Sequence, residues 1–244
     1  MEKTDFKPVE IPLWIDHALP FFAYVDTWLT SLPHLDLADV ASPPTHTAIV
    51  SVDVINGFCH QGPLASPRVK EIIEPIVRLF RRAWDAGVRH ILLPQDTHEP
   101  NAVEFAQYPP HCVRGTVEAE TVPEIRALPF FDRMTILEKN SIHSGLDTRL
   151  DAWIDAHPEV DTYIVVGDCT DLCTYQLAMH LRLGANARQL KRRVLVPVDG
   201  VDTYDLPVDA AAAVGAVPHD AEVLHRIFLY SLRLNGVEVV AALD

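Results

Sequence analysis

A carboxylate, an amine and a thiol follow three apolar runs of this sequence. Asp53 comes directly after the run 49–52, Lys139 lies two residues past the run 134–137, and Cys173 follows a third run more distantly. A thiol with an ordinary pKa of about 8.5 is mostly protonated at neutral pH, so it needs a base beside it or a lowered pKa to attack a carbonyl. These three residue types together are suited to nucleophilic hydrolysis.

Taken singly, each of these side chains has an ordinary structural explanation: a capping aspartate, a solvated lysine and a small buried hydrophobic residue. The surroundings of Cys173 add an argument, because Thr170 or Asp171 can cap a helix that begins there. Cys173 would then lie in the first helical turn, where the helix dipole favours the thiolate. Cys169 is placed in the turn before the helix and suits a backbone donor better than a nucleophile.

A second group of residues has the types that bind metals. Asp96, His98, Glu104 and His111 bring carboxylate and imidazole groups into one segment. Such a set suits Zn²⁺, Fe²⁺ or Mn²⁺, with water completing the coordination shell. With twelve histidines in the chain, the alternative is a polar loop whose histidines face solvent.

These residues need a scaffold that brings them together, and the alternation of short β-rich runs with helical segments predicts one. We expect strands at 47–52, 88–93, 134–137, 163–166, 194–198 and 237–241. We expect helices at about 67–86, 120–127, 147–157, 171–184 and 208–234, the last broken around Gly215 and Pro218. The pattern is typical of a three-layer αβα fold with a mostly parallel six-stranded sheet. In such sheets ligands bind beyond the carboxyl ends of the strands, where the residues above fall.

Residues 1–46 differ from the predicted hydrolase domain at 47–244. They hold six of the 19 prolines and include apolar stretches that are unlike a solvated tail. We interpret them as an N-terminal extension, partly helical over about 18–32, that packs on the main domain or on another subunit. A homo-oligomer is therefore expected.

Composition narrows the choice of partners and location. The chain has 244 residues, 48% of them hydrophobic, and a formal net charge of −14. That charge repels nucleic acids and anionic membrane surfaces, so neither is expected as a partner. The charged start of the chain and its lack of a long apolar run predict a cytoplasmic protein with four free cysteines.

The order of these motifs resembles the isochorismatase-like cysteine hydrolases, most of all the nicotinamidase branch. The resemblance covers about 47–200. It is carried by Asp53, Asp96-Thr97-His98, Pro109-Pro110-His111-Cys112-Val113-Arg114-Gly115-Thr116, Lys139 and Gly167-Asp168-Cys169-Thr170-Asp171-Leu172-Cys173.

The resemblance implies a role for each catalytic residue. Asp53 would be the general base, Lys139 its charged partner and Cys173 the nucleophile. The backbone N–H groups of Cys169 and Cys173 would form the oxyanion hole, beside a cis peptide between Asp168 and Cys169.

The resemblance also implies a divalent metal, with zinc as the first choice and iron or manganese as alternatives. Asp96, His98 and His111 would bind it, and Glu104 occupies a place where some nicotinamidases have a fourth ligand. In that branch the metal is thought to hold the pyridine nitrogen of the substrate and to order water.

Several pocket positions depart from the family pattern. Phe58 fits an aromatic wall of the nicotinamide pocket, although a core phenylalanine is the alternative. Tyr108 stands where a tryptophan is frequent, and Leu146 where an aromatic residue often closes the ring pocket. Asp168 replaces the small or apolar residues that are usual before the oxyanion turn. These departures concern the substrate more than the reaction.

The sequence thus predicts a hydrolase of small amides, with nicotinamide converted to nicotinic acid and ammonia through a cysteine thioester. Another amide or carbamoyl hydrolase of the same family is one alternative. A non-catalytic binding module is the other.

Overall fold

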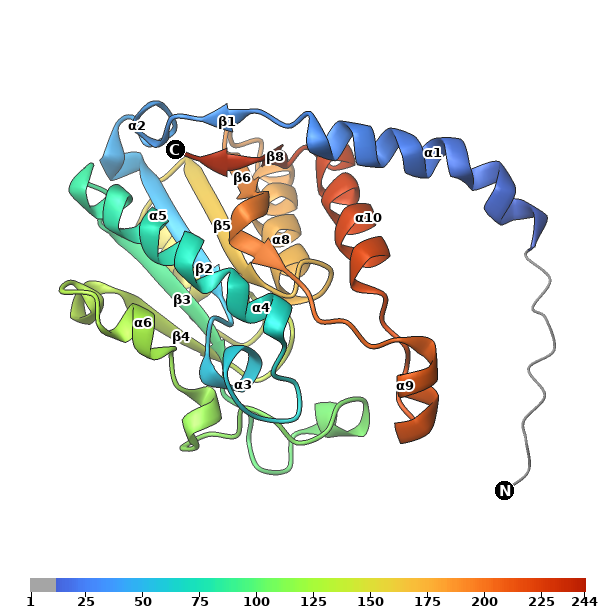
Figure 1. Ribbon diagram of the computed structural model, residues 1–244. Coiled ribbons are helices and arrows are strands. Elements are labelled where there is room, and N and C mark those ends of the chain that lie inside the picture. Colours follow the sequence, from blue (N-terminus) through green and yellow to red (C-terminus); the bar gives the residue numbers. More distant parts are fainter. Residues whose placement is uncertain (1–11) are drawn as a thin grey trace, which may run out of the picture.

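A parallel sheet runs through the centre of the computed structural model, which describes residues 12–244 (Figure 1). Its main strands lie in the order β4 (Thr135–Lys139), β3 (His90–Asp96), β2 (Thr47–Val52), β5 (Thr162–Asp168), β6 (Arg193–Pro197) and β8 (Glu238–Val240). A seventh strand, β7 (Val201–Asp202), pairs with β5. A separate two-stranded sheet joins β1 (His34–Leu35) to β9 (Ala242–Leu243).

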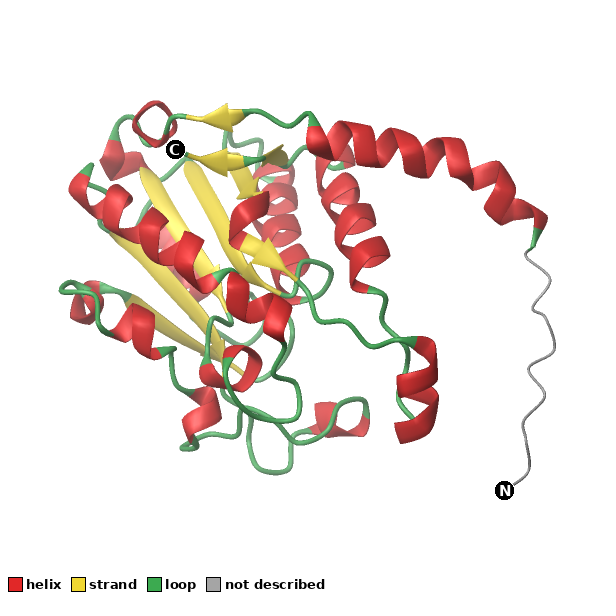
Figure 2. Ribbon diagram, viewed as in Figure 1, coloured by secondary structure: helices red, strands yellow, loops and turns green. Residues whose placement is uncertain are grey.

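Helices cover both faces of the sheet, as Figure 2 shows. The α-helices are α1 (Leu13–Thr30), α2 (Leu37–Val40), α3 (Asn56–Cys59), α4 (Pro67–Glu71), α5 (Ile73–Asp85), α6 (Pro123–Arg126), α7 (Leu150–Ala156), α8 (Cys173–Ala187), α9 (Val208–Val214) and α10 (Ala221–Leu234). Short 3-10 turns lie at Pro44–His46, Val103–Ala106, Val117–Ala119, Phe131–Arg133 and Val198–Gly200. The predicted three-layer αβα class is confirmed.

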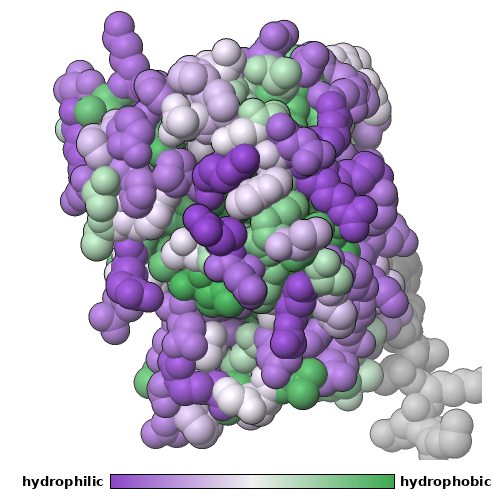
Figure 3. Space-filling model, turned by 90° about the vertical axis from the view of Figure 1, so that its left-hand side faces the viewer, coloured by the Kyte–Doolittle hydropathy of each residue, from purple (hydrophilic) through white to green (hydrophobic). Residues whose placement is uncertain are grey.

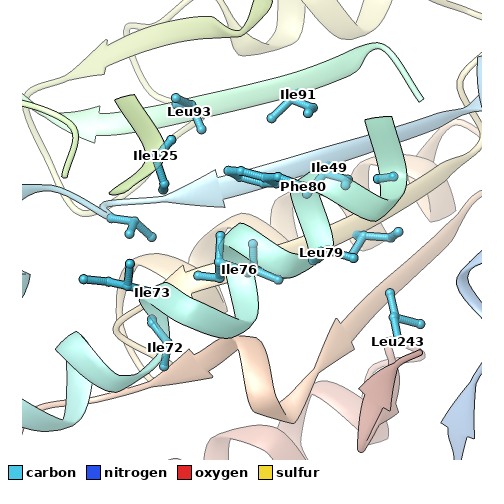
Figure 4. Packing of buried hydrophobic residues seen from close by; sticks show 14 of the residues in the cluster. Ile49, Ile72, Ile73, Ile76, Leu79, Phe80, Ile91, Leu93, Ile125 and Leu243 are labelled. Atoms are coloured by element: carbon cyan, nitrogen blue, oxygen red, sulfur yellow. The ribbon is translucent and has the colours of Figure 1, made fainter. Parts of the chain in front are cut away.

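The two faces of the sheet bury alternate residues of the same strands, as the pleat of a β-strand requires. On β2, Ile49 belongs to one core cluster and Val50 to the other. The first cluster is closed mainly by α5, whose Ile76 and Phe80 are fully buried between the helix and the sheet (Figure 4). The second cluster is closed by α8 and α10, with Leu177, Leu229 and other apolar residues facing the sheet. Both faces of the strands are therefore apolar, which explains their continuous hydrophobic runs.

All six predicted strands are present, and so are the helices between them. The predicted break in the last helical segment is also found, because α9 ends at Val214 and Gly215 follows in the left-handed conformation with φ 70°. The strands that were not predicted are β1, β7 and β9, which are two residues long each, and the four-residue helices α2 and α3 were not predicted either. Strands this short carry no periodic signal and form only because a distant segment offers a free edge.

The described part of the N-terminal extension packs on the rest of the chain. Helix α1 lies across the end of α10, where Val25 and Trp28 are buried and the rings of Trp28 and Tyr230 lie 5.5 Å apart (Figure 1). Strand β1 pairs in parallel with β9 near the C-terminus. Residues 1–11 of the extension lie outside the described residues, and its boundary at residue 46 stays a prediction.

One face of the molecule shows how polar and apolar side chains are distributed on the surface. Most side chains on the face shown in Figure 3 are hydrophilic, with hydrophobic side chains gathered in smaller areas between them. Within residues 12–244, no helix combines the length and the apolar character that crossing a bilayer requires.

Candidate active site

The strand order brings four ionisable residues to neighbouring positions at one end of the sheet. Strands β4, β3, β2 and β5 are adjacent, and they end at or next to Lys139, Asp96, Asp53 and Asp168. The register sets Lys139 opposite Asp96. Because parallel strands share one carboxyl edge, these side chains lie together although the sequence spreads them widely.

Close backbone packing fixes the end of β2. Gly167 on β5 has φ +114°, and a Cβ atom added there would lie 2.0 Å from the carbonyl oxygen of Val52. Only glycine allows the two strands this approach. Asp53 follows Val52 with φ 58°, a left-handed conformation that aspartate tolerates better than most residues. Its Oδ1 accepts a hydrogen bond of 2.8 Å from the backbone N–H of Asp96.

A buried lysine links the acids to the thiol. Lys139 Nζ lies 2.7 Å from Asp53 Oδ2, 2.6 Å from Asp96 Oδ1 and 3.7 Å from Cys173 Sγ. It also donates to the carbonyl oxygen of Ser141 at 3.1 Å. The side chains of Lys139 and Asp53 are wholly inaccessible to solvent, so their attraction is weakly screened.

These contacts and burial shift the pKa values in definite directions. Burial and the neighbouring Asp96 raise the pKa of Asp53 to about 6, against the opposing effect of Lys139. Burial alone would lower the pKa of Lys139, but Asp53 and Asp96 hold it well above its usual value. Burial raises the pKa of Cys173 well above its usual value, although Lys139 acts in the opposite direction.

The expectation that the helix terminus lowers the pKa of Cys173 is therefore wrong for the free protein. Burial outweighs the favourable charge of Lys139, so the net shift of the Cys173 pKa favours the protonated thiol. An oxygen of Asp53 and the Cys173 sulfur lie within 4.8 Å of each other. A base is therefore within reach of the thiol proton once a substrate orders the two groups.

The turn between β5 and α8 presents backbone donors beside the thiol. The Asp168–Cys169 peptide bond is cis, as expected. The carbonyl oxygen of Cys169 accepts hydrogen bonds from the N–H groups of Leu172 and Thr174. Among residues 12–244, no acceptor takes the N–H groups of Cys169 and Cys173. Two free donors next to a nucleophile are what an oxyanion hole requires.

The predicted capping of this helix by Thr170 or Asp171 is not observed. Helix α8 begins at Cys173 with Leu172 at the N-cap position and no capping side chain. Asp171 is instead engaged elsewhere: Thr203 donates to its Oδ1 at 2.6 Å, and His219 Nε2 lies 2.7 Å from its Oδ2. The segment after β7 thereby fixes the turn that carries the thiol.

A three-residue group next to this centre has the arrangement of a metal site. Asp96, His98 and His111 offer ligand atoms that all lie within 4.8 Å of one another, and all three residues are buried. His98 Nε2 has no hydrogen-bond partner among the described residues. The other ring nitrogen of each histidine is held in place, 3.1 Å from Asn140 Oδ1 for His98 and 2.8 Å from the Pro109 carbonyl oxygen for His111.

This donor set fits a divalent metal, since two oriented imidazoles and a carboxylate are typical ligands and an unpartnered buried nitrogen is left to bind it. Glu104 lines the same cavity but is not part of the three-residue group. Asp53, Asp96 and Cys173 also lie close together. The Lys139 ammonium group lies among them, however, and would repel a second cation there.

A mostly apolar cavity opens onto the thiol. Phe58 and Tyr108 line it, as the sequence suggested. Leu146 is not among the lining residues and is 61% exposed, whereas Ile142 of the same loop faces the cavity. Asp168 lines the cavity too, and the structure adds lining residues that the sequence analysis did not single out: Leu64, Val69, Leu172 and Tyr204.

Known proteins resemble this chain in sequence and in fold. The model of the Isochorismatase domain family matches residues 47–226. "Nicotinamidase 1" of Arabidopsis thaliana is 31% identical over an alignment of 213 positions, which covers 80% of this chain and 86% of that relative. "Nicotinamidase/pyrazinamidase" of Mycobacterium tuberculosis is 30% identical over an alignment of 176 positions, which covers 67% of this chain and 91% of that relative. The solved structure of the pyrazinamidase of Pyrococcus horikoshii in complex with zinc has a TM-score of 0.61 at 20% identity, covering 80% of this chain and 98% of that one.

Proposed function

Because the chain belongs to the isochorismatase family, we propose that it is an amidohydrolase that converts nicotinamide to nicotinic acid and ammonia. The nicotinamidase relatives support the substrate and the class of reaction. The observation that carries the proposal for this chain is the contact of one buried lysine, Lys139, with Asp53 and with Cys173, whose side chain lines the cavity.

In the first half of the reaction, we assign the thiol of Cys173 as nucleophile. Asp53 takes its proton, and the sulfur forms a bond to the carbonyl carbon of the amide. The carbonyl oxygen becomes an oxyanion and receives hydrogen bonds from the N–H groups of Cys169 and Cys173. Lys139 keeps Asp53 oriented and offsets the negative charge of the site.

In the second half, Asp53 returns the proton to the amide nitrogen, the carbon–nitrogen bond breaks, and ammonia leaves. A water molecule then attacks the thioester while Asp53 accepts one of its protons. Collapse of that intermediate releases the acid and restores the thiol of Cys173. The raised pKa of Asp53, about 6, suits a group that alternates between base and acid near neutral pH.

A divalent metal would be held by Asp96, His98 and His111, with Glu104 nearby as a candidate fourth ligand. When bound, it supplies a Lewis acid that anchors the ring nitrogen of the substrate. We propose zinc, supported by the donor set and by the zinc complex of the related fold.

The cavity supports a small flat amide as substrate. Phe58, Tyr108 and Tyr204 contribute aromatic rings to its wall. An aromatic ring can pack against them while its amide group reaches Cys173.

The test is ammonia release from nicotinamide by the metal-loaded protein, with Cys173→Ala and Cys59→Ala as variants and a chelated sample. We expect release by the wild type and a loss of about 10⁴-fold or more in Cys173→Ala. Cys59→Ala should keep its activity, because Cys59 is buried and does not line the cavity. No release by folded, metal-loaded wild type would contradict nicotinamide as substrate, and a panel of other small amides would follow.

We also propose a cytoplasmic location and a homo-oligomeric state. The location is supported by the four cysteines, which are all free and buried in the described structure. The oligomer is supported by the exposed apolar residues at the start of α1, with Leu13 75% and Trp14 64% exposed. Light scattering tests the oligomeric state.

A further inference from the structure

Asp171 stands in the turn between the two N–H groups that we assign to the oxyanion hole, those of Cys169 and Cys173. Its side chain is almost completely buried. Thr203 donates a hydrogen bond of 2.6 Å to its Oδ1, and His219 Nε2 lies 2.7 Å from its Oδ2. Both oxygens of the carboxylate are therefore engaged by the segment after β7, and no side chain caps α8.

This arrangement departs from what an aspartate before a helix usually does. Its carboxylate commonly accepts a hydrogen bond from the N–H group two residues ahead, because the first turn of a helix has unpaired donors. Asp36 does so in this chain, where its Oδ1 accepts from the N–H group of Ala38 at 2.8 Å at the start of α2. For Asp171, the N–H group two residues ahead is that of Cys173. A carboxylate in the usual position would occupy this oxyanion donor.

Both partners of the Asp171 carboxylate are fixed in place. Thr203 is completely buried, and His219 is 7% exposed. His219 and Leu206 exchange two backbone hydrogen bonds, and His219 Nδ1 lies 2.8 Å from the carbonyl oxygen of Tyr204. These contacts orient the imidazole ring so that its Nε2 meets the carboxylate. Because the group is buried, water does not replace the hydrogen bonds once they are lost.

We propose that Thr203 and His219 are positioning residues for catalysis, because they hold both oxygens of Asp171 and so keep the N–H group of Cys173 free for the substrate oxyanion. Without them, the carboxylate would turn back to this N–H group. It would block one of two donors and place a negative charge where the oxyanion forms. The inference rests on the proposed amidase function and deepens it, since neither positioning residue lines the cavity.

Two variants break the same contacts with opposite consequences. Thr203→Val/His219→Phe removes both donors and releases the carboxylate. The phenylalanine keeps a ring to pack on Tyr204, whose ring centre is 3.9 Å from that of His219. Asp171→Ala loses the same two hydrogen bonds but leaves no carboxylate to occupy the N–H group. The triple variant combines these substitutions, and Thr203→Ser is the conservative variant that keeps the hydroxyl group.

The readout compares two reactions of the Cys173 thiol. With p-nitrophenyl acetate, the sulfur forms a bond to the carbonyl carbon, an oxyanion develops, and p-nitrophenolate leaves. With iodoacetamide, the sulfur displaces iodide and no oxyanion develops. In both reactions Asp53 takes the thiol proton, and the rate measured in Cys173→Ala is subtracted to remove the other cysteines. The ratio of the acylation rate constant to the alkylation rate constant therefore reports stabilisation of the oxyanion and cancels general damage to the nucleophile.

We expect this ratio to fall about 100-fold in Thr203→Val/His219→Phe, as for the loss of one oxyanion donor. In Asp171→Ala, the triple variant and Thr203→Ser it should stay within about fivefold of the wild type, because the N–H group of Cys173 stays free. His219→Phe alone releases one oxygen and should lower the ratio by a smaller factor, which keeps the test available if the double variant does not fold. The kcat for nicotinamide should follow the same order with little change in KM.

An unchanged ratio in Thr203→Val/His219→Phe and in His219→Phe would overturn the proposal. An equal fall in Asp171→Ala would overturn it as well, because the contacts would then only hold the turn in place. So would a wild-type Cys173 that reacts with neither reagent. If the wild type does not hydrolyse nicotinamide, the proposed function fails, while the ratio of the two reactions still decides the role of Thr203 and His219.

Discussion

The Lys139 ammonium group lies 2.7 Å from the Asp53 carboxylate, and neither side chain is exposed to solvent. Such a pair has an asymmetric energetic role. Because Lys139 also lies 2.6 Å from Asp96, removing the lysine leaves two buried carboxylates without a counter-charge, whereas removing Asp53 together with it leaves one.

We therefore expect Lys139→Met to destabilise the fold by about 3–5 kcal/mol and Asp53→Asn/Lys139→Met to recover part of that loss. Urea unfolding of the wild type, the two single variants and the double variant gives the coupling free energy. Lys139→Met should be inactive because Asp53, the proposed base, is no longer held in position. The double variant should be inactive as well, since it also lacks that base. If the losses of unfolding free energy in the two single variants add up to the loss in the double variant, the two residues do not stabilise each other.

The candidate metal site makes a separate prediction about binding. His98→Ala and His111→Ala each remove one of three clustered ligands and should lower zinc affinity by more than about 100-fold, since changes in the outer shell alone cost 10–100-fold. Zinc is measured by competition with a chelating dye. His180→Ala is the matched control, because His180 pairs with Asp151 outside the cluster and should bind zinc like the wild type. Equal zinc affinities in the wild type and all the variants would contradict a metal site at these residues.

Glu104→Gln distinguishes a fourth ligand from a neighbour. If Glu104 binds the metal, its amide variant should weaken zinc binding in the same assay, by about tenfold or more. Wild-type affinity in this variant would mean that Glu104 only lines the cavity.

The contact between His219 and Asp171 predicts a pH-dependent contribution to stability. Burial opposes the charged forms, but the hydrogen bonds of the pair raise the pKa of His219 and lower that of Asp171. The histidine contribution is full below its unfolded pKa of about 6.5 and is lost as pH rises through the higher folded value. The aspartate contribution is full above its unfolded pKa of about 3.9 and is lost as pH falls through the lower folded value.

His219→Gln should therefore cost the most between about pH 4 and 6.5, by about 1–2 kcal/mol, and less at pH 8 or pH 3. Denaturant unfolding across this range measures it. His34→Gln is the control, because the partners His34 and Asp244 are 63% and 70% exposed and their pair should contribute little at any pH. A pH-independent cost for His219→Gln would mean that stacking on Tyr204, at 3.9 Å between ring centres, accounts for all of it.

Two glycines predict opposite effects of the same substitution. Gly167→Ala would drive a Cβ atom to 2.0 Å from the Val52 carbonyl oxygen, and it should destabilise the fold by more than about 3 kcal/mol. Gly184 lies inside α8 with no atom in the way of a Cβ, so Gly184→Ala should stabilise it by about 0.5–1 kcal/mol. Thermal unfolding measures the stability of the two variants. A Gly167→Ala variant as stable as the wild type would mean that β2 and β5 do not approach each other this closely.

Much of the fold was predictable because long apolar runs and amphipathic helices carry a strong local signal. Strands β2 and β5 are buried along their whole length, and their continuous apolar runs in the sequence indicate this burial. Pairings such as β1 with β9 were not predictable, since they join residues 34–35 to 242–243 through backbone contacts. The order of the strands, which sets Lys139 beside Asp96, also has no local signature.

The candidate site was predictable in its residues and less so in its environment. The proposed catalytic and metal-binding side chains meet because each follows a strand of one sheet. Tyr204 was missed because it reaches the cavity from a segment with no motif of its own. Leu146 was chosen by its place in a family pattern, but its loop turns Ile142 inward instead. The protonation state of Cys173 depends on burial, which sequence spacing does not express.

The position of Lys139 has a consequence for how the protein acquires activity. Strand β4 is at the edge of the sheet and, among the described strands, pairs only with β3, while the thiol follows the central strand β5. The lysine can reach Asp53 and Cys173 only after four strands from distant parts of the chain have assembled side by side. Recovery of turnover during refolding therefore reports completion of the sheet up to its last edge, not the earlier collapse of the chain.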